Sequence, residues 1–501
     1  MATKKQKKKA INTAKKVAKK KPLLVIFLLL LVIGAGVAVI VLFNMGVFDK
    51  FIKKSDAQPT GTTGTQQVEP SASGEIEKHY AEDGYTENII YDNFQIHFME
   101  LGNEFAGDST YIKAGDVDIL IDAGSRGNSA PTLNEYIKKY CTDGKLEYVI
   151  ATHNHQDHIA AFAGNSDTKA KNFKGEKVSK TGVLYYYEVG TLIDFTYAGV
   201  SEKIDGVTKT VTYENKTQVS SDFGSGTEYG KYLAAREYAI SKGAKYYTAK
   251  DLWDNNNTSF TLADGITMDI LYNYYYFNQS SDINNYSVCT MFNYNTHHFL
   301  LTGDLELEGE EKLVEYYDGS NKEKTLPECD LFKAGHHGSK TSSNECLLEV
   351  IKPKICCVCC CAGTPEYTNN VEHQFPTQAF INRIAKYTSR VYVTSMVKFI
   401  EDKWQTVSMN GNITIMCDGT TVGIKASNNL TRLKDTEWFN EKIYAVKTKD
   451  TYVWNKAGDK FDVYKNCDKT EEHLNKMTFY NKDTPNAVLI PRRVWPANGV
   501  Q

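Results

Sequence analysis

Beyond residue 54 the chain has no excess of positive charge. The 501 residues carry a net charge of −3, but residues 1–54 hold thirteen Lys and one Asp, which leaves −15 for the remainder. An acidic body is a poor non-specific ligand for polyanions. The composition therefore excludes binding to nucleic acid through overall charge, and only local basic patches are left for that purpose.

The sequence also lacks the cysteine pattern of a disulfide framework. Eleven Cys cannot all pair within one chain, and five of them lie in residues 356–361 (CCVCCC). A metal knuckle is the alternative, but it would separate C-x-x-C pairs by loop residues. The apolar Ile355 and Val358 instead favour a buried strand in which Cys serves as a small hydrophobic residue.

Charged residues are absent from one long segment near the N-terminus. Leu23 to Phe43 is an uncharged run of 21 residues, about 31 Å long as a helix and able to span a bilayer. A cleaved signal peptide is the alternative, but its apolar region would be shorter and would end at a small-residue cleavage site. Residues 1–21 carry ten Lys and no acid, which predicts a basic cytoplasmic tail. We therefore expect a single-pass transmembrane helix over residues 22–44 of a cell-membrane protein, with the following domain extracellular.

The remaining chain divides by composition into a linker, a domain and a short C-terminal part. Residues 45–75 are rich in Gly, Thr, Ser and Pro without periodicity, which predicts a flexible linker. Strands alternate with helices over residues 76–426, which predicts α/β packing. The expected strands include 94–98, 117–121, 146–151, 183–187 and 266–272, and the expected helices include 132–140 and 230–243. Residues 427–501 are expected to form a small appendage of unknown role.

Histidine is scarce, with 11 in the chain, yet three fall within residues 153–158 (HNHQDH). His153 and His155, two residues apart on an extended backbone, point to the same side and can reach one cation. Asp157 and His158 follow where the chain turns and can face a second cation. Nitrogen and oxygen ligands suit Zn²⁺, Mn²⁺ or Fe²⁺. The alternative is a polar loop with three unrelated histidines.

With four further motifs, this segment resembles the metallo-β-lactamase superfamily and, within it, the hydrolase domain of ComEC-type competence (DNA-uptake) proteins. The five motifs, in the family's order, are 120–124 (LIDAG), 153–158, 300–306 (LLTGDLE), 333–343 (KAGHHGSKTSS) and a weaker segment, 367–376. The resemblance implies an α/β fold, a four-layer αββα metallo-β-lactamase sandwich. Nothing in the chain resembles the multi-helix channel of ComEC proteins.

The resemblance also implies a site for two divalent metal ions, Zn or Mn. The expected metal ligands are His153 and His155 for the first ion, Asp157, His158 and one of His336 or His337 for the second, and Asp304 as the bridge. We favour His336, because it comes first after the predicted strand 331–333. Asp122 would orient the histidine segment from behind the ligands.

One histidine that many superfamily members supply to the first metal is missing. No histidine occurs from Ile159 to Thr296, and His297 and His298 lie on a predicted strand. The first metal would then have two histidines, Asp304, and water or substrate, which leaves its occupancy open. Residues 282–287 (DINNYS) either line this place or form an Asn-rich turn.

Polar residues after the histidine pair are candidates for binding substrate. Ser339, Lys340, Thr341 and Ser342 could hold a phosphate oxygen, and a helix beginning near residue 344 would add its N-terminal amides. Ordinary capping of that helix by Ser343 is compatible with this role. By the resemblance, His373 would reach the substrate side of the metals.

These observations predict a membrane-anchored extracellular hydrolase, a phosphodiesterase or nuclease of ComEC-like type. By the resemblance, a dinuclear metal-bound hydroxide would attack the ester, with Asp157, Asp304 and His373 as catalytic residues. The partners would be the lipid bilayer, through Leu23–Phe43, and a phosphodiester, which the resemblance suggests is DNA. Alternatives are a small-ester hydrolase such as a cell-wall phosphocholine esterase, and a catalytically weak binding protein that keeps the fold. No protein partner is expected.

Overall fold

The computed structural model describes residues 75–76, 93–224, 226–320, 325–368, 371–400, 403–448, 451–454 and 487–501. The predicted cytoplasmic tail, the predicted transmembrane helix and nearly all of the predicted linker lie outside these residues. Within the described ranges, no helix combines the length and the apolar character needed to cross a membrane.

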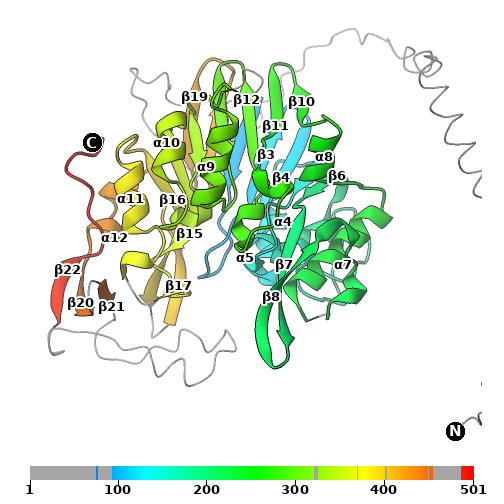
Figure 1. Ribbon diagram of the computed structural model, residues 1–501, viewed down its shortest axis with the longest axis horizontal. Coiled ribbons are helices and arrows are strands. Elements are labelled where there is room, and N and C mark those ends of the chain that lie inside the picture. The colour runs from blue at the N-terminus through cyan, green and yellow to red at the C-terminus, as the bar shows by residue number, and fades with distance from the viewer. Residues whose placement is uncertain are drawn as a thin grey trace, which may run out of the picture. The chain divides into compact units, whose positions relative to one another are not determined.

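Two large β-sheets form the centre of the described domain (Figure 1). The N-terminal sheet contains, in sheet order, β1 (Glu75–Ile76), β19 (Val422–Ala426), β18 (Ile413–Cys417), β2 (Phe94–Phe98), β3 (Thr110–Ala114), β4 (Val117–Ile121), β5 (Lys145–Ile150), β6 (Glu188–Asp194) and β9 (Lys245–Thr248). The C-terminal sheet contains β10 (Ser259–Ala263), β11 (Ile266–Ile270), β12 (Thr290–Tyr294), β13 (His297–Leu301), β14 (Leu331–Lys333), β15 (Ile355–Ala362), β16 (Val391–Ile400) and β17 (Lys403–Ser408).

Helices and two smaller sheets complete the described structure. The helices are α4 (Ala130–Ile137), α5 (Gln156–Ala163), α6 (Val183–Tyr186), α7 (Glu228–Ser241), α8 (Ala249–Asp254), α9 (Leu307–Tyr316), α10 (Glu345–Ile351), α11 (Gln378–Ile384) and α12 (Glu437–Asn440). Strands β7 (Tyr197–Ile204) and β8 (Val207–Glu214) form a hairpin, and β21 (Thr451–Trp454), β20 (Lys442–Thr448) and β22 (Val488–Pro491) form a small sheet.

Part of each large sheet is parallel, and this part carries the site. Strands β4, β5, β6 and β9 pair in parallel in the first sheet, as β13, β14, β15 and β16 do in the second. Parallel pairing requires crossover connections, which α4 to α7 and α9 to α11 supply here. The carboxyl ends of the parallel strands therefore lie at one edge of each sheet, as binding sites of α/β proteins require.

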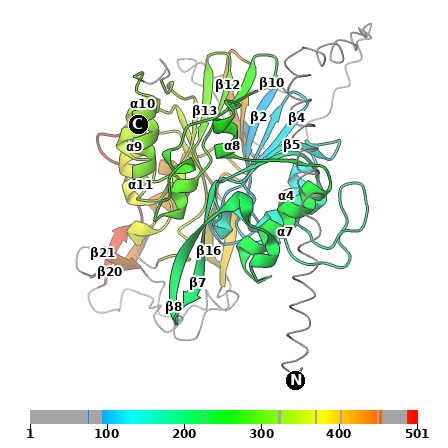
Figure 2. The same ribbon diagram turned by 45° about the vertical axis from the view of Figure 1, so that its right-hand side comes forward.

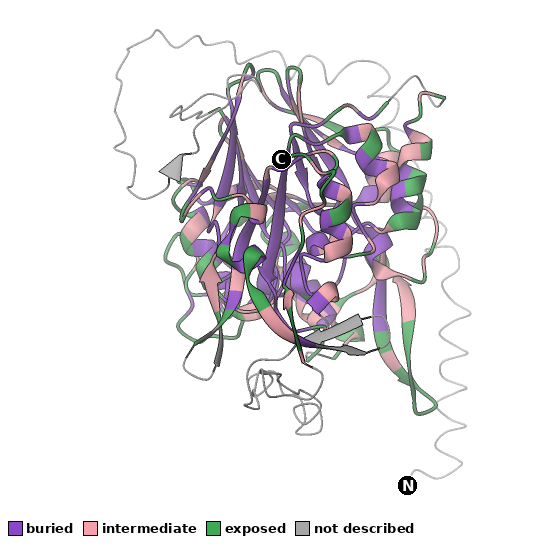
Figure 3. Ribbon diagram, turned by 90° about the vertical axis from the view of Figure 1, so that its left-hand side faces the viewer, coloured by how far each residue is buried: buried purple, intermediate pink, exposed green. Residues whose placement is uncertain are grey.

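The two sheets face each other, and helices cover their outer faces (Figure 2). Phe94 of β2 meets Phe299 of β13 between the sheets, with ring centroids 5.0 Å apart. Helices α4 to α7 pack on the N-terminal sheet, and α9 to α11 pack on the C-terminal sheet. The central strands are accordingly buried along most of their length (Figure 3). The predicted α/β packing is confirmed.

The cysteine-rich segment forms the buried strand that the sequence predicts. All eight residues of β15 are buried, and the strand pairs with β14 and β16. Cys357 and Cys359 face the core between the sheets, while Cys356 and Cys360 face the helices. The ten cysteines of the described residues are free thiols. Here Cys fills small apolar volumes on both faces of a parallel sheet.

The strand predicted over residues 183–187 is wrong. Val183–Tyr186 is the short helix α6, and strand β6 begins only at Glu188. Val and Tyr favour strands, but α6 packs Val183, Leu184 and Tyr185 against the helices of the N-terminal sheet. Burial on that helical layer outweighs the intrinsic preference of the backbone.

Candidate metal centre

The loops that follow four strands, β4 and β5 of one sheet and β13 and β14 of the other, meet at one place between the two sheets. Asp122 follows β4, His153 follows β5 through Ala151 and Thr152, and Asp304 follows β13. The pair His336 and His337 follows β14 in the tight turn Gly335–Gly338. The sequence therefore brings together at strand ends the residues that were predicted as metal ligands.

Asp304 lies at the centre of this cluster. Its Oδ2 atom is 3.0 Å from Nε2 of His158, 3.5 Å from Nε2 of His337, and 3.9 Å from Nε2 of both His153 and His336. Its Oδ1 atom is buried and has no hydrogen-bond partner within the described residues. A buried carboxylate with four imidazoles around one oxygen and an unpaired second oxygen has the position of a bridging metal ligand.

His153 and His155 converge beside Asp304. Nε2 of His153 is 3.0 Å from Nδ1 of His155. Helix α5 begins at Gln156, so the two histidines end an extended segment before the chain turns. Between them, the Asn154 side chain is used elsewhere and pairs with the backbone N–H and C=O of Gly199 in β7. The structure thus places the two predicted first-site ligands together.

Asp157 and His337 form the other half of the cluster. Asp157 lies in the first turn of α5, and its Oδ2 atom is 3.3 Å from Nε2 of His337. The His337 ring is fully buried, and its Nδ1–H donates to the carbonyl oxygen of Cys359 at 2.9 Å. That bond leaves Nε2 as the nitrogen that faces Asp157 and Asp304.

His336 is the weaker candidate of the pair, contrary to the preference that the order of residues gave. Its Nδ1 lies 3.1 Å from Oε1 of Glu306, and its side chain is 23% exposed. Both histidines have left-handed backbone conformations, with φ of 46° and 54°, which turn His336 toward the cavity and His337 inward. The geometry therefore favours His337 for the second metal.

Asp122 orients two of the histidines. Its carboxylate accepts the backbone N–H and the hydroxyl of Thr152, both at 2.7 Å, and lies 2.7 Å from Nδ1 of His158. The same Thr152 oxygen lies 3.1 Å from Nδ1 of His153. Both rings are thereby held with Nε2 toward Asp304, which is the role predicted for Asp122.

Asp108 contacts Nδ1 of His337, as Asp122 contacts Nδ1 of His158. The sequence gave no indication that Asp108 belongs to the site. Its Oδ1 is 3.2 Å from Nδ1 of His337, and its other oxygen is ion-paired with the buried Lys333. Asp108 precedes β3 and has no histidine near it in the sequence, so only the fold brings it to the site. Its backbone N–H also donates to the Asp157 carbonyl at 3.0 Å.

The charges in the cluster follow from burial and from these contacts. Burial alone would raise the pKa values of Asp157 and Asp304, but the surrounding imidazoles lower both pKa values well below the ordinary range. Burial and the neighbouring His158 lower the pKa of His153 well below its usual value. The ionised Asp157 and Asp304 and the neutral His153 are therefore in the forms that bind metal.

Against the effect of burial, Asp304 and Asp122 raise the pKa of His158 well above its usual value, and Asp304 and Asp108 raise the pKa of His337 to about 10. A metal ion would have to displace a proton from each of these two rings.

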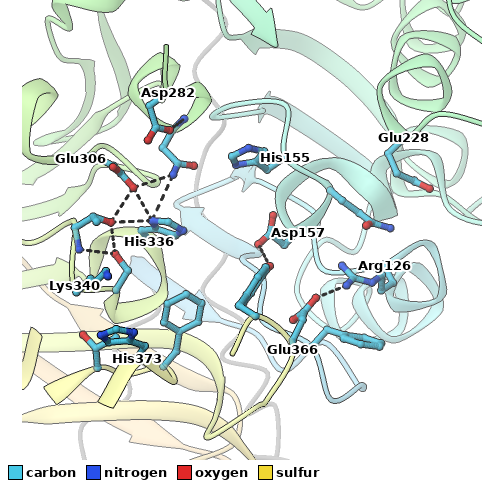
Figure 4. Close-up of a pocket in the computed structure, with 18 of the residues that line it drawn as sticks. Arg126, His155, Asp157, Glu228, Asp282, Glu306, His336, Lys340, Glu366 and His373 are labelled. Atoms are coloured by element: carbon cyan, nitrogen blue, oxygen red, sulfur yellow. Dashed lines mark hydrogen bonds and ion pairs between the residues drawn. The ribbon is translucent and has the colours of Figure 1, made fainter. Parts of the chain in front are cut away.

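A cavity of about 1120 Å³ opens over this cluster (Figure 4). Of the predicted ligands, His155, Asp157 and His336 line it, while His153, His158, Asp304 and His337 are buried. Residues 282–287 contribute Asp282 and Asn284 to its wall, so this segment does line the site. The remaining lining side chains include Phe105, Arg126, Glu228, Glu306, Ser339, Lys340, Thr341, Glu366, Tyr367, His373 and Phe375.

The predicted phosphate-binding residues differ in their positions. Ser339, Lys340 and Thr341 line the cavity, and the Thr341 hydroxyl donates to Glu306 at 2.8 Å. Ser342 is fully buried with its hydroxyl 3.4 Å from the Asp304 carbonyl oxygen, so the expectation that Ser342 contacts substrate is wrong. His373 lines the cavity, as expected.

The predicted anion site at the start of α10 is also wrong. The backbone N–H groups of Ser343 and Asn344 donate to the carboxylate of Glu310 at 2.6 and 2.8 Å. The amides that could have met a phosphate therefore already meet an acidic side chain of the protein itself. Sequence alone shows a helix N-terminus but not which anion it faces.

Two further side chains of the cavity wall had no specific signal in the sequence. The Tyr367 hydroxyl donates to Oδ2 of Asp157 at 2.9 Å. Arg126 forms an ion pair with Glu366, and its guanidinium carbon lies 4.3 Å from the centre of the Phe105 ring. Tyr367 thus reaches the metal cluster directly, and Arg126 is held in place by a carboxylate and an aromatic ring.

The C-terminal residues support the loop that carries Phe375. Arg493 is buried and donates to the carbonyl oxygens of Gln374 and Pro376. The Gln378 amide pairs with both backbone groups of Val494. The Phe375 ring lies 5.7 Å from the His337 ring. The end of the predicted appendage is therefore part of the support of the site.

Among the described residues, three groups of three side chains bring potential ligand atoms within 4.8 Å of one another, and two of these groups lie in this cluster. They are His153 with His158 and Asp304, and Asp108 with His158 and His337. Together with the unpaired Oδ1 of Asp304, these imidazoles and carboxylates suit divalent first-row metal ions. The residues present fit a metal centre.

Comparison with known proteins agrees with this geometry. Residues 102–168 match the metallo-beta-lactamase superfamily. The chain is 30% identical over 109 residues to Recombination protein 2 of Haemophilus influenzae, and 33% identical over 97 residues to Competence protein ComA of Neisseria gonorrhoeae. The first match covers 21% of this chain, the second covers 19%, and each spans only 12% of the relative.

Solved structures that are similar to this chain include two at low TM-scores. The metallo-beta-lactamase fold protein YhfI of Bacillus subtilis has a TM-score of 0.30 and 11% identity, covering 61% of this chain and 96% of that one. The short form of human tRNase Z has a TM-score of 0.24 and 12% identity, covering 60% and 92%. The predicted resemblance to the metallo-β-lactamase superfamily and to competence proteins is confirmed by the sequence matches. The domain has a mixed α/β metallo-β-lactamase fold, which implies divalent metal binding.

Proposed function

We propose that this domain is a metal-dependent hydrolase that cleaves a phosphodiester. One observation carries the proposal: a buried carboxylate, Asp304, with four imidazole nitrogens within 3.9 Å of one oxygen, lies directly beneath a large cavity. Structural metal sites are closed by protein ligands, whereas catalytic sites are open to solvent and substrate. His155, Asp157 and His336 connect this centre to the cavity.

Two ions are proposed, with Asp304 between them. His153 and His155 would hold the first ion, and Asp157, His158 and His337 would hold the second. Zn²⁺ or Mn²⁺ suits these ligands. When bound, such ions lower the pKa of water and stabilise negative charge that develops on phosphorus.

The protein's own groups position the ligands and receive the substrate. Asp122 and Asp108 fix the orientation of His158 and His337 from behind. Tyr367 presents a hydroxyl at the cavity wall beside Asp157. A phenol is protonated at neutral pH. The single O–H of Tyr367 donates to Asp157 in this structure and would have to turn away from Asp157 to donate to a phosphate oxygen or to the departing alkoxide. His373 and Lys340 lie together on the wall nearer His336 (Figure 4).

A nucleic-acid backbone is the substrate we propose first. Lys340 and Arg126 lie on opposite sides of the cavity, with His336 and Asp157 between them (Figure 4). An extended polyanion that contacted both cations would pass over the metal centre. The match to competence proteins supports DNA, although the chain spans about an eighth of those relatives.

A smaller phosphoester is the second candidate. Asp282, Glu306 and Glu228 also line the cavity, and such carboxylates repel a polyanion while attracting a cationic group. An ester such as phosphocholine of the cell wall would place its phosphate at the metals and its cation near these acids. We further propose that the domain acts outside the cell, tethered by residues 22–44.

The test uses the full chain in detergent with Zn²⁺ or Mn²⁺, beside the double variant His153→Ala/Asp304→Asn. The substrates are bis-p-nitrophenyl phosphate, single-stranded DNA and p-nitrophenyl phosphocholine. We expect metal-dependent turnover that the double variant loses, and the preferred substrate identifies the class of ester. A wild-type protein that turns over none of the three with either metal would contradict the hydrolase and favour a binding protein that keeps the fold.

A further inference from the structure

The loop between β14 and α10, residues 334–344, carries His336, His337 and Lys340 and is anchored by a buried carboxylate. Glu310 of α9 is completely buried. Its Oε1 accepts the backbone N–H of Ser343 at 2.6 Å, and its Oε2 accepts the backbone N–H and the side-chain amide of Asn344, both at 2.8 Å. One side chain therefore satisfies three donors at the end of this loop.

Arg383 of α11 binds the carbonyl groups of the same loop. Its Nε donates to Ser343 O at 2.9 Å, and its Nη2 lies 2.8, 3.1 and 3.4 Å from the carbonyl oxygens of Ser342, Lys340 and Ser339. A loop without a repeating backbone pattern needs such partners, because buried N–H and C=O groups are costly when unpaired. Glu310 accepts hydrogen bonds from the N–H groups of the loop, and Arg383 donates hydrogen bonds to its carbonyl groups.

The anchored end of the loop is coupled to the end that bears the histidines. Ser343, whose backbone is left-handed with φ of 59°, accepts the Gly335 N–H with its hydroxyl at 3.0 Å. Gly335 directly precedes His336. Ser342 reaches the carbonyl oxygen of Asp304 at 3.4 Å. A displacement of residues 342–344 would therefore move both the histidine turn and the contact to Asp304.

Among the described residues, the polar contacts of Glu310 and Arg383 with the loop do not include the side chain of any predicted metal ligand. Glu310 and Arg383 come from helices on the outer face of the C-terminal sheet, beneath the loop. Neither side chain lines the cavity. Their effect on catalysis would therefore act through the loop alone, which distinguishes them from residues that touch substrate.

We propose that Glu310 and Arg383 are a pair of positioning residues that set the loop bearing His337 and Lys340 in its active geometry. The proposal rests on the proposed function, since it assigns the pair to that site. Removing either member leaves several buried backbone groups without partners. The loop would then relax, with loss of metal affinity at the second site and of turnover.

The charge of Glu310 gives the clamp a dependence on pH. Burial raises the Glu310 pKa to about 7, against the bonds from Asn344 and Ser343 and the charge of Arg383. The other titratable groups that interact with this carboxylate are the thiols of Cys289 and Cys346, which stay protonated near neutral pH. A proton on either oxygen would place a donor against a backbone N–H. The clamp is therefore complete only when Glu310 is ionised.

The experiment compares Glu310→Gln and Arg383→Lys with Glu345→Gln in the full chain. Glu310→Gln keeps the shape but turns an NH₂ group toward a backbone donor, and Arg383→Lys keeps the charge but loses the fork. Glu345 is the matched control, because its carboxylate on α10 pairs with Lys386 and Tyr387 instead of the loop. Three quantities are measured: hydrogen–deuterium exchange of residues 334–344, bound Zn²⁺, and kcat and KM for bis-p-nitrophenyl phosphate across pH 5–9.

For both clamp variants we expect faster exchange of the loop and a 10- to 100-fold loss in zinc affinity or kcat, with Glu345→Gln like the wild type. The rise of wild-type kcat around pH 7 should also be lost in Glu310→Gln. Loop exchange that is unchanged in both variants would overturn the proposal, as would an equal loss in Glu345→Gln. Loop exchange and zinc binding decide this even if the wild type hydrolyses none of the substrates, an outcome that would refute only the proposed function.

Discussion

Oδ2 of Asp122 lies 2.7 Å from Nδ1 of His158, on the edge of the ring opposite to the nitrogen that faces Asp304. One imidazole therefore joins two buried carboxylates. The first carboxylate holds the proton on Nδ1, so that Nε2, once it has lost its own proton, would be the nitrogen that binds a metal ion. The fold thus fixes the orientation of the His158 ring before any metal ion binds.

Replacing Asp122 by Asn should weaken metal binding without removing a ligand. The amide keeps its size and one acceptor oxygen, but it replaces by an NH₂ donor the Oδ2 atom that accepts the Thr152 hydroxyl and faces Nδ1 of His158. We expect zinc affinity to fall 10- to 100-fold, measured by competition with a chromophoric chelator. Asp254→Asn, a change at an exposed residue of α8, is the control and should have wild-type affinity. Equal affinity in the three proteins would show that Asp122 has no orienting role.

His336 and His337 should respond differently to substitution by Ala. His337→Ala should lower the amount of bound metal, because its buried Nε2 faces Asp157 and Asp304. His336→Ala should retain metal and raise KM, because this ring lies in the cavity wall. Elemental analysis and steady-state kinetics separate the two effects. Loss of metal in His336→Ala with metal retained in His337→Ala would instead identify His336 as the ligand.

Tyr367→Phe tests the only hydroxyl in the described residues that is hydrogen-bonded to Asp157. The variant keeps the ring beside Phe375 but removes the O–H donor. If this group donates to substrate, kcat should fall by about 10- to 100-fold, with metal content unchanged. Tyr274→Phe, a partly exposed tyrosine outside the cavity lining, should leave kcat as in the wild type. Unchanged kcat in Tyr367→Phe would exclude the hydroxyl from catalysis.

The ion pair of His297 with Asp330 should make stability depend on pH. The hydrogen bond to Asp330 raises the His297 pKa, and the bonds from His297 and Lys354 outweigh burial to lower the Asp330 pKa. The stabilisation from His297 is therefore complete below about pH 6.5, the ordinary histidine pKa, and is lost as the pH rises through the higher pKa of the folded protein.

Urea unfolding of the wild type and His297→Gln measures this effect. Relative to the variant, the wild type should lose at most about 1 kcal/mol of unfolding free energy between pH 6 and pH 9, because the ring is partly solvated. The pair lies at the opposite end of β13 from Asp304, so metal binding does not complicate the comparison. A difference that does not change with pH would contradict the assigned contribution.

The sequence predicts those parts of the fold and site that depend on local spacing. The buried strands and the pattern of residues 153–158 are local, and the structure gathers them with Asp304 as expected. The choice between His336 and His337 is not local, because it depends on two left-handed residues that turn one ring outward. A residue's order after a strand does not fix the direction of its side chain.

Asp108 and Glu310 show a second limit. Both are acidic residues without neighbours that suggest a role, and each meets its partner across a large gap in the sequence, Asp108 with His337 and Glu310 with Ser343. Only the packing of the strands and helices brings these pairs together. Helix α6 illustrates the same limit in the fold, since tertiary packing overrides the strand preference of Val and Tyr.

The metal content of the purified full chain tests the central claim most directly. Wild type and Asp304→Asn would be loaded with Zn²⁺, freed of excess metal and assayed by elemental analysis, with Asp254→Asn as the control. The account predicts close to two zinc ions per wild-type and control chain and fewer than one per Asp304→Asn chain, because Asp304 would supply a ligand to both ions. Equal zinc in Asp304→Asn and the wild type, or none in any of the three, would contradict it.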